Sequence, residues 1–330
     1  MAPAPSVMAQ RHRGPTLRVV MTGAGGFLGA HLLARFVGAG MAVTVVGPDT
    51  GESRYTARMV AAGDVGFVRC DAGFTDAGVV GALEEADALV LAGFGDPASS
   101  SETPLNAVDI DRTVLPLARL VSGFARRGKH LILASSDSVY GAPERTPVRE
   151  CDPTRPQTAV GLINVACEQA IRVSSLVGAT ASVLRYATIY GPGETATRAV
   201  PNLIRAALAG RGPVLEDDGV DEHDYVHVTD AVDATLSALR RRADGTYNVG
   251  TGVGTTTAEL ANLVVWLTGC SETPIRGAGA DHPTRGSVVL DTSRAHLDLA
   301  FQARHALADG LKEEVGWFRA MFRSNLKTAA

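Results

Sequence analysis

Thr22-Gly23-Ala24-Gly25-Gly26-Phe27-Leu28-Gly29 directly follows the apolar run 17–21 and opens a stretch of helical pattern at about 27–39. Gly23 allows a tight turn, Gly26 lets backbone N–H groups approach a pyrophosphate at the helix N-terminus, and Gly29 permits close packing of helix on strand. A lone glycine motif also fits an ordinary strand-to-helix turn. Because this motif follows a strand and precedes a helix, it favours a dinucleotide-binding site.

Short apolar and β-branched runs alternate with helical stretches up to about residue 190. This alternation predicts an α/β fold with a doubly wound, parallel Rossmann-type sheet in residues 17–190. Residues 191–330 are expected to form a smaller, mainly substrate-binding lobe, with some segments returning to the Rossmann domain. Residues 1–16 contain three prolines and no long apolar stretch, which predicts a disordered tail. The expected strands are 17–21, 41–46, 66–69, 88–92, 130–134 and 180–185, and the clearest expected helices are 108–127, 159–177, 230–241, 257–268 and 305–323.

Composition narrows the functional classes. The chain has 330 residues, 45% of them hydrophobic, and a formal net charge of −4, so it can bury a large core and carries no basic stripe for nucleic acid. No apolar run approaches the roughly 20 residues that a membrane helix needs. The four cysteines form no CxxC pair, which is typical of a reduced cytoplasmic protein without a disulfide framework or a metal site.

Several ordered segments carry a family resemblance: the glycine loop and residues 135–141, 185–193, 224–230 and 247–252. With them the chain resembles the extended short-chain dehydrogenase/reductase family, which contains nucleotide-sugar epimerases and dehydratases. The resemblance covers nearly everything from residue 17 to residue 322. It implies a bound nicotinamide dinucleotide, with Ser136 at the position of the serine or threonine that hydrogen-bonds the reacting carbonyl. A serine pair at a strand end can also do no more than cap a turn.

The resemblance also implies contacts to the cofactor and to the substrate, with Arg54 added because its charge suits a phosphate. The residues expected at the cofactor are Gly23, Gly25, Gly26, Phe27, Leu28, Arg54, Asp71, Ala72, Leu91, Ala92, Gly93, Ala134, Tyr186, Thr188 and Ile189. Those expected at the substrate are Ser138, Tyr190 and His223.

The proton donor of the family is missing. Family members have a tyrosine and a lysine at i and i+4 on one helix face, and the lysine lowers the tyrosine pKa. Glu168 sets the register, because the family usually has an acidic residue four positions after the lysine, and counting back gives Asn164 and Val160. Valine has no proton to give, and Asn164 can only hydrogen-bond a ribose hydroxyl. The remaining candidates for moving the proton are Ser136, Asp137, a tyrosine, water or the substrate itself.

A second departure concerns the substrate. Nucleotide-sugar members usually have arginines where this chain has His223 and, by approximate register, Ala278, and the loop 216–222 is acidic. Because a sugar diphosphate is held by cationic groups, these residues favour an uncharged substrate, unless Arg276 or Arg285 substitutes. A solvated acidic rim is the alternative for the loop.

The end of the second strand favours NADP(H) over NAD(H). An acidic residue there would bind the adenosine ribose and exclude a 2′-phosphate, but the position is Gly47, and Pro48 is expected to displace Asp49. Arg54 and Arg58 follow and could receive the phosphate, unless this segment is a mobile loop with solvated arginines.

These observations favour an NADPH-dependent ketoreductase that reduces a ketone on a polycyclic aromatic secondary metabolite, similar to the atypical angucyclinone ketoreductases of antibiotic biosynthesis. By that resemblance the substrate's own hydroxyl would help to protonate the alkoxide. Two alternatives stay open: a cofactor-binding protein without turnover, and a nucleotide-sugar epimerase or reductase with relocated acid groups. The helices expected at 108–127 and 159–177 form the dimer bundle in many family members, so the sequence is compatible with a homodimer.

Overall fold

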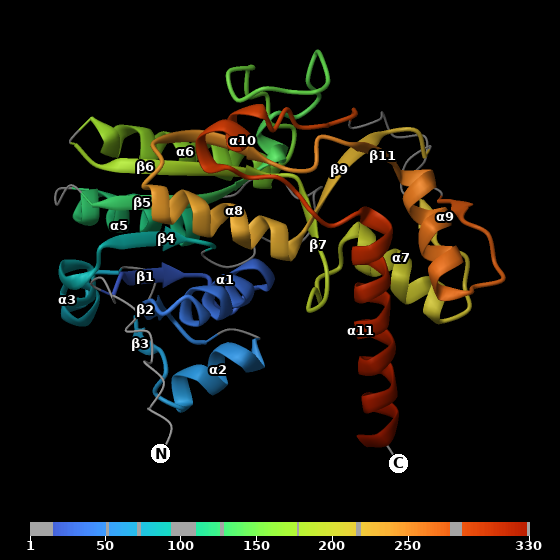
Figure 1. Ribbon diagram of the computed structural model, residues 1–330, viewed down its shortest axis with the longest axis horizontal. Helices are drawn as coiled ribbons and strands as arrows, with labels where there is room; N and C mark the ends of the chain where they lie inside the picture. Colours follow the sequence, from blue (N-terminus) through green and yellow to red (C-terminus); the bar gives the residue numbers. More distant parts are fainter. Residues whose placement is uncertain are drawn as a thin grey trace, which may run out of the picture.

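A parallel sheet in the order β10-β6-β5-β4-β1-β2-β3 forms the centre of the protein (Figure 1). The computed structural model describes residues 16–50, 53–70, 74–93, 110–125, 129–176, 178–215, 219–277 and 286–328. Neighbouring strands of this sheet are all parallel, which confirms the predicted α/β fold. The strands are β1 (Arg18–Thr22), β2 (Ala42–Gly47), β3 (Gly66–Arg69), β4 (Ala88–Leu91), β5 (His130–Ser136), β6 (Thr180–Tyr186) and β10 (Gly245–Val249).

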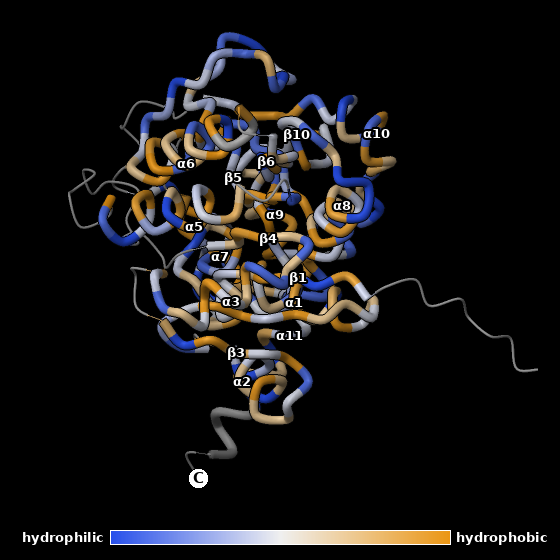
Figure 2. The backbone as a smooth tube through the Cα atoms, turned by 90° about the vertical axis from the view of Figure 1, so that its left-hand side faces the viewer, coloured by the Kyte–Doolittle hydropathy of each residue, from blue (hydrophilic) through white to orange (hydrophobic). Residues whose placement is uncertain are grey.

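Helices cover both faces of the sheet, and this double cover explains why strands such as β4 are apolar on both sides. One face carries the core cluster that includes side chains of α1 and α8, and the opposite face carries a second cluster with side chains of α3, α5 and α6. Figure 2 shows α5 and α6 on one side of the sheet and α8 on the other. The helices are α1 (Phe27–Gly38), α3 (Ala77–Glu85), α5 (Leu115–Ala125), α6 (Ala159–Ser175) and α8 (Val228–Arg241).

The helix expected at 108–127 differs most from the structure. It begins with a π-helical turn, η1 (Ile110–Val114), and becomes α-helical only from Leu115 onward. Pro116 lies in the first turn of α5, where a fixed φ and a missing N–H are tolerated. The apolar periodicity of this segment does not reveal the change of winding, because both kinds of turn bury similar side chains.

The later part of the chain builds a second core beside the main sheet, centred on buried side chains such as Leu203, Leu260 and Leu311. A small sheet in the order β11-β9-β7 joins the two parts, and Figure 1 shows α7, α9 and α11 grouped on its far side. β10 instead pairs with β6 at the edge of the main sheet. The elements are β7 (Thr188–Tyr190), β8 (Val214–Leu215), β9 (Glu222–His227), β11 (Gly254–Thr256), β12 (Ile275–Arg276), α7 (Ala199–Leu208), α9 (Thr257–Thr268), α10 (Ser293–Leu299) and α11 (Leu307–Thr328).

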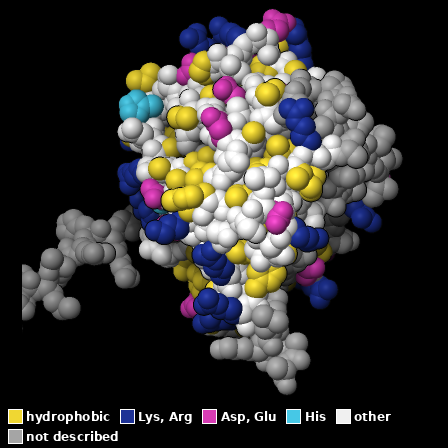
Figure 3. Space-filling model, turned by 90° about the vertical axis from the view of Figure 1, so that its right-hand side faces the viewer, with side chains coloured by type: hydrophobic (Ala, Val, Ile, Leu, Met, Phe, Trp, Pro, Cys, Tyr) yellow, Lys and Arg dark blue, Asp and Glu magenta, His cyan; other side chains and the backbone are white. Residues whose placement is uncertain are grey.

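The strand order reverses at β1, because the chain continues to β2 and β3 on one side and to β4, β5 and β6 on the other. In open parallel sheets the carboxyl ends of the strands at such a switch point form the ligand crevice. The face in Figure 3 shows lysines and arginines interspersed with acidic and apolar side chains. In the described parts of the chain, no helix has the length and apolar character needed to cross a membrane.

Candidate active site

The glycine loop packs tightly enough to explain two of its glycines. Gly23 has a φ of +69°, and a Cβ there would lie 2.6 Å from the backbone nitrogen of Gly93, in the loop after β4. A Cβ on Gly29 would overlap the carbonyl oxygen of Gly23. A side chain at either position would therefore push the loop away from the switch point, so both glycines are needed for the fold itself.

Gly26 has a different reason to be glycine. It is the N-cap of α1 and provides no side-chain cap, and a Cβ there would meet nothing closer than the Gly23 oxygen at 3.5 Å. The protein would thus tolerate a small side chain at this position. A glycine here leaves open space over the first N–H groups of α1, including those of Phe27 and Leu28, where an anion would sit. This loop therefore fits a dinucleotide pyrophosphate.

The adenosine end of the site is framed by β2 and α2 (Arg54–Ala61). Thr56 of α2 donates a hydrogen bond to the carbonyl oxygen of Ala24 at 2.7 Å, which fastens this helix to the glycine loop. Ser53 accepts from the Thr56 backbone N–H as the N-cap of α2, and Arg54 is exposed. The backbone oxygen of Asp49 lies 3.6 Å from the place of a Gly47 Cβ, so Asp49 remains beside the end of β2.

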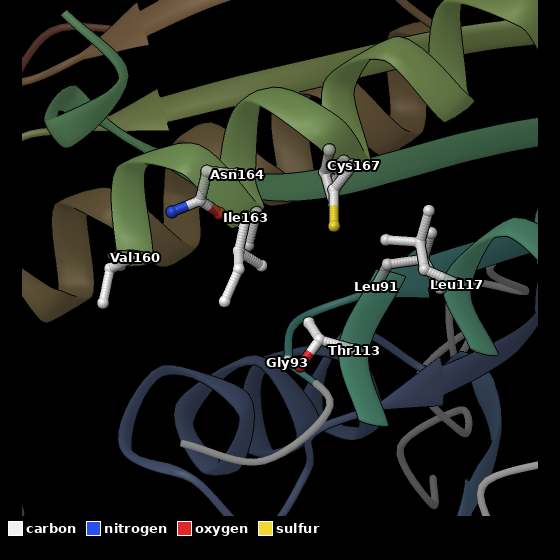
Figure 4. Close-up of a pocket in the computed structure, with 10 residues that line it drawn as sticks. Leu91, Gly93, Thr113, Leu117, Val160, Ile163, Asn164 and Cys167 are labelled. Carbon is white, nitrogen blue, oxygen red and sulfur yellow. The ribbon is translucent and has the colours of Figure 1, made fainter. Parts of the chain in front are cut away.

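A pocket lies under α6, at the carboxyl ends of β4 and β5 (Figure 4). It brings together four predicted site residues, because Leu91, Gly93, Ala134 and Asn164 all line it. In Figure 4 the Asn164 amide points from α6 into the open space. Sequence reasoning missed Thr113, Leu117, Leu133, Ile163 and Cys167, which also line it. The spacing of 160, 163, 164 and 167 is that of one helix face, and this signal could have identified the α6 residues.

A buried ion pair fixes the register of α6. Arg185 on β6 contacts both carboxylate oxygens of Glu168, at 3.0 and 2.7 Å, and Ser135 on β5 donates to the same carboxylate at 2.6 Å. The two charged side chains are only 7% and 6% exposed. This anchor supports the counting from Glu168, so Val160 and Asn164 occupy the helix positions where the family has tyrosine and lysine.

The serine segment ends β5 and forms a short 3-10 turn, η2 (Asp137–Val139). Ser136 does cap this turn, since its Oγ accepts from the Ser138 backbone N–H at 3.1 Å, and it also donates to Asp137 Oδ1 at 3.0 Å. Burial raises the pKa of Asp137 to about 7; its hydrogen bond from Ser136 opposes the rise, and the nearby Asp224 carboxylate adds to it. Ser138 Oγ is buried without a hydrogen-bond partner among the described residues.

The first turn of α6 lies directly against this serine segment. A Cβ on Gly161 would be 2.5 Å from the carbonyl oxygen of Ser138, so only glycine allows the contact. Positions 160 and 164 therefore flank the turn that carries Ser136 and Asp137. The arrangement combines a hydroxyl, a carboxyl that titrates near neutrality and an amide at one edge of the sheet, which is a set suited to proton transfer.

The remaining predicted residues are less directly placed. Tyr186 is buried and its hydroxyl pairs with Thr235 at 2.6 Å, while Tyr190 is fully buried in the second core. Thr188 and Ile189 lie on β7, and His223 is half-buried on β9. Asp71, Ala72, Ala278 and Arg285 lie outside the described residues, as do residues 1–15 and 216–218. Among the described residues, no group of three or more His, Cys, Asp or Glu side chains could hold a metal ion.

The strand order, the glycine loop and the pocket at the switch point define a Rossmann-type dinucleotide-binding protein. The model of the NAD dependent epimerase/dehydratase family matches residues 19–250, and the chain belongs to this family. The predicted resemblance to the extended short-chain dehydrogenases/reductases is thereby confirmed.

Relatives and solved structures over nearly the full length support this assignment. UDP-glucose 4-epimerase of Mycolicibacterium smegmatis is 32% identical, covering 92% of this chain and 99% of its own. The structure of UDP-glucose 4-epimerase with UDP-glucose from Thermotoga maritima superposes with a TM-score of 0.80 at 25% identity, covering 93% and 100% of the two chains. That of MoeE5 in complex with UDP-glucuronic acid and NAD gives a TM-score of 0.77 at 28% identity, covering 92% and 99%.

These comparisons show that the predicted polyketide ketoreductase is wrong, because the similar proteins are UDP-sugar enzymes and none supports an angucyclinone substrate. The argument from missing arginines failed for a physical reason. A diphosphate can be held by N–H groups and cations anywhere around the site, and sequence registers only two of those positions.

The preference for NADP(H) is also wrong, since the structural neighbours with a cofactor contain NAD. The structure offers the reason. Pro48 does not carry Asp49 away from the strand end, and the Ser53 hydroxyl is already engaged in capping α2. An acidic residue that stays at this edge disfavours a 2′-phosphate, and an exposed arginine such as Arg54 does not by itself reverse that preference.

Proposed function

We propose that the protein is an NAD-dependent epimerase or reductase that acts at a hydroxyl-bearing carbon of a nucleotide sugar, with Asp137 in place of the missing tyrosine. The observation that supports it is a carboxyl group beside Ser136, at the carbonyl-facing end of β5, whose pKa of about 7 suits both proton uptake and proton release. The similarity to UDP-glucose 4-epimerases over nearly the full chain supports the substrate class.

NAD, when bound, would accept a hydride from the sugar carbon and return it, to either face in an epimerase. The protein's part is to move the hydroxyl proton in step with that hydride. Ser136 Oγ has one lone pair engaged by the Ser138 N–H and a second free for a sugar hydroxyl. A sugar O–H that donates to Ser136 can pass its proton through the serine, because Ser136 in turn donates to Asp137. Reversal of the same path returns the proton.

The loss of the lysine is consistent with this assignment. In the family resemblance, the lysine lowers the pKa of a tyrosine, whose ordinary value is about 10. A carboxyl raised to a pKa of about 7 needs no such help, and a nearby cation would lower its pKa again. Asn164 keeps the capacity to hydrogen-bond a ribose hydroxyl while it leaves the charge of Asp137 unaltered.

The test measures cofactor and turnover together. The purified protein is examined for bound NAD, then incubated with UDP-glucose, UDP-galactose and UDP-glucuronic acid while NADH absorbance and epimer composition are followed. D137N should lower kcat/KM by roughly 10²–10⁴-fold and remove the pH dependence near 7. D298N is the matched control, because Asp298 is an exposed partner of Arg294 on α10.

Three outcomes separate the possibilities. Turnover that D137N leaves unchanged contradicts the role of Asp137. NAD binding without turnover of any of the three sugars supports a cofactor-binding protein without catalysis, the alternative that Val160 and Asn164 favour. A protein that neither binds NAD nor turns over these sugars contradicts the proposal as a whole.

A further inference from the structure

Two buried carboxyl groups meet where the loop after β7 joins the C-terminal helix. Glu194 lies in that loop and is 2% exposed, and Glu314 lies on α11 and is 0% exposed. Both carboxylate oxygens of Glu314 lack a hydrogen-bond partner among the described residues. An ionised carboxylate in such a place would be strongly destabilising, since its charge is neither solvated nor paired.

The neighbouring cations do not neutralise this pair. Arg198 approaches Glu194 only to 3.8 Å and is itself 61% exposed. Arg205 spends its guanidinium on the carbonyl oxygens of Ala196 and Thr195 and on the ring of Phe318, 5.2 Å from its centroid. The other titratable groups around the junction are Tyr190 on β7, His227 and Asp230 at the start of α8, His305 before α11, His31 on α1, and Asp309 and Glu313 on α11.

Burial is the main influence on both acids. It raises the pKa of Glu194 to about 7, against the opposing effect of Arg198 and Arg205. It raises the pKa of Glu314 to about 8, and the negative charge of Glu194 adds to the rise. Near neutral pH the pair therefore retains at least one proton in the folded protein, whereas both acids would be ionised in the unfolded chain.

The junction is packed closely on all sides, so the pair cannot be relieved by a small shift. A Cβ on Gly310 would overlap the Tyr190 hydroxyl, and a Cβ on Gly191 would lie 3.0 Å from His227 Nε2. On its other side the loop touches the cofactor helix, where a Cβ on Gly193 would lie 3.3 Å from His31 Cε1 and 3.9 Å from the Phe27 ring. Movement of this loop would thus reach the first turn of α1.

We propose that Glu194 and Glu314 form a protonated latch that holds the loop after β7 against α11, and that loss of its proton at alkaline pH loosens both the junction and the adjacent first turn of α1. The stability part of the proposal is independent of the proposed function. Its effect on the cofactor rests on the proposed NAD site.

The expected pH dependence follows from the direction of the shifts. Because the folded protein holds protons that the unfolded chain releases from about pH 4.5 upward, the unfolding free energy falls as pH rises toward about 8 and then levels off. His227, whose pKa is lowered by burial and by His305, titrates below its ordinary value of 6.5 and does not contribute above it. Asp137 titrates in the same window and contributes equally to the wild type and to the latch variants.

The experiment compares wild type, E314Q, E194Q and the surface control E85Q by urea unfolding from about pH 6.5 to 9. Glutamine mimics the protonated acid, so E314Q should reduce the slope of the unfolding free energy by about one proton. E85Q, which removes one exposed carboxylate from α3, should keep the wild-type slope. Wild-type slopes in both E314Q and E194Q, or an equal reduction in E85Q, would overturn the latch; E194Q also serves if E314Q does not fold.

A second measurement tests the reach of the latch to α1. NAD affinity of the wild type, measured by calorimetry, should weaken between about pH 7 and 9 by a larger factor than that of E314Q. If the protein binds no NAD at any pH, the proposed function fails while the unfolding result still decides the latch. If NAD binds with the same pH dependence in both proteins, the latch does not extend to α1.

Discussion

Restoring the family's acid couple on α6 is the sharpest test of how this site works. In V160Y/N164K the new side chains enter a frame that already exists, because Gly161 holds the first turn of α6 against the Ser138 carbonyl and Asn164 already points into the pocket. A positioned acid contributes roughly 10²–10⁴-fold in rate. If Asp137 supplies this factor, D137N loses it in the wild type, whereas D137N in the V160Y/N164K background should lose less than about tenfold.

The measurement is a double-mutant cycle on kcat/KM with the best of the UDP-sugars. A factor of 10²–10⁴ corresponds to a coupling free energy of about 2.7–5.5 kcal/mol between Asp137 and the restored couple. V160F/N164K is the matched control, because it supplies the ring and the cation without the hydroxyl and should not rescue D137N. An additive cycle, in which D137N costs the same in both backgrounds, would refute the reasoning, since Asp137 would then act on binding or folding and not on the proton.

Further predictions concern the frame around the site. G29A should destabilise the protein by about 1–3 kcal/mol and weaken NAD binding, because the added methyl overlaps the Gly23 carbonyl; a normal Tm with normal binding would contradict the packing. E168A should cost roughly 3–5 kcal/mol in urea unfolding by leaving Arg185 buried and unpaired, and a much smaller loss in E168M/R185M would show that the cost belongs to the unpaired charge. Burial lowers the pKa of His130 from 6.5 to about 4, so stability present above pH 6.5 should decline by about 3 kcal/mol as pH falls to 4, and H130Q should flatten this acid limb.

The parts of the fold that sequence predicted well are those set by local rules. Gly23 and Gly29 were identified because a tight turn and a close helix–strand approach each demand glycine, and the structure shows both contacts. The apolar runs of the central strands were equally clear, since a strand covered on both faces must be apolar throughout. Glu168 set the register of α6 because one acidic residue at a fixed spacing is enough to number a helix, and its ion pair with Arg185 supports that numbering.

The features that sequence could not supply depend on contacts between distant segments. Asp137 was named as a candidate, but its raised pKa arises from burial and from Asp224, which no local pattern reveals. The choice of NADP(H) relied on distance along the chain from Gly47, whereas the turn returns Asp49 to the strand end. Glu314 occupies an ordinary position in an amphipathic helix, and its conflict with Glu194 exists only once α11 has docked.

The position of the anchor explains how the acid couple could be lost without loss of the site. Glu168 and Arg185 hold α6 by contacts one and two turns beyond positions 160 and 164, so substitutions at those two positions leave the helix where it was. The pocket floor comes from β4 and β5, which are equally indifferent to them. Under these conditions a change of proton donor requires only one new group at the serine turn, and a carboxyl at 137 already meets Ser136 there. The frame and the chemistry are therefore encoded by different residues, and only the chemistry has departed from the family.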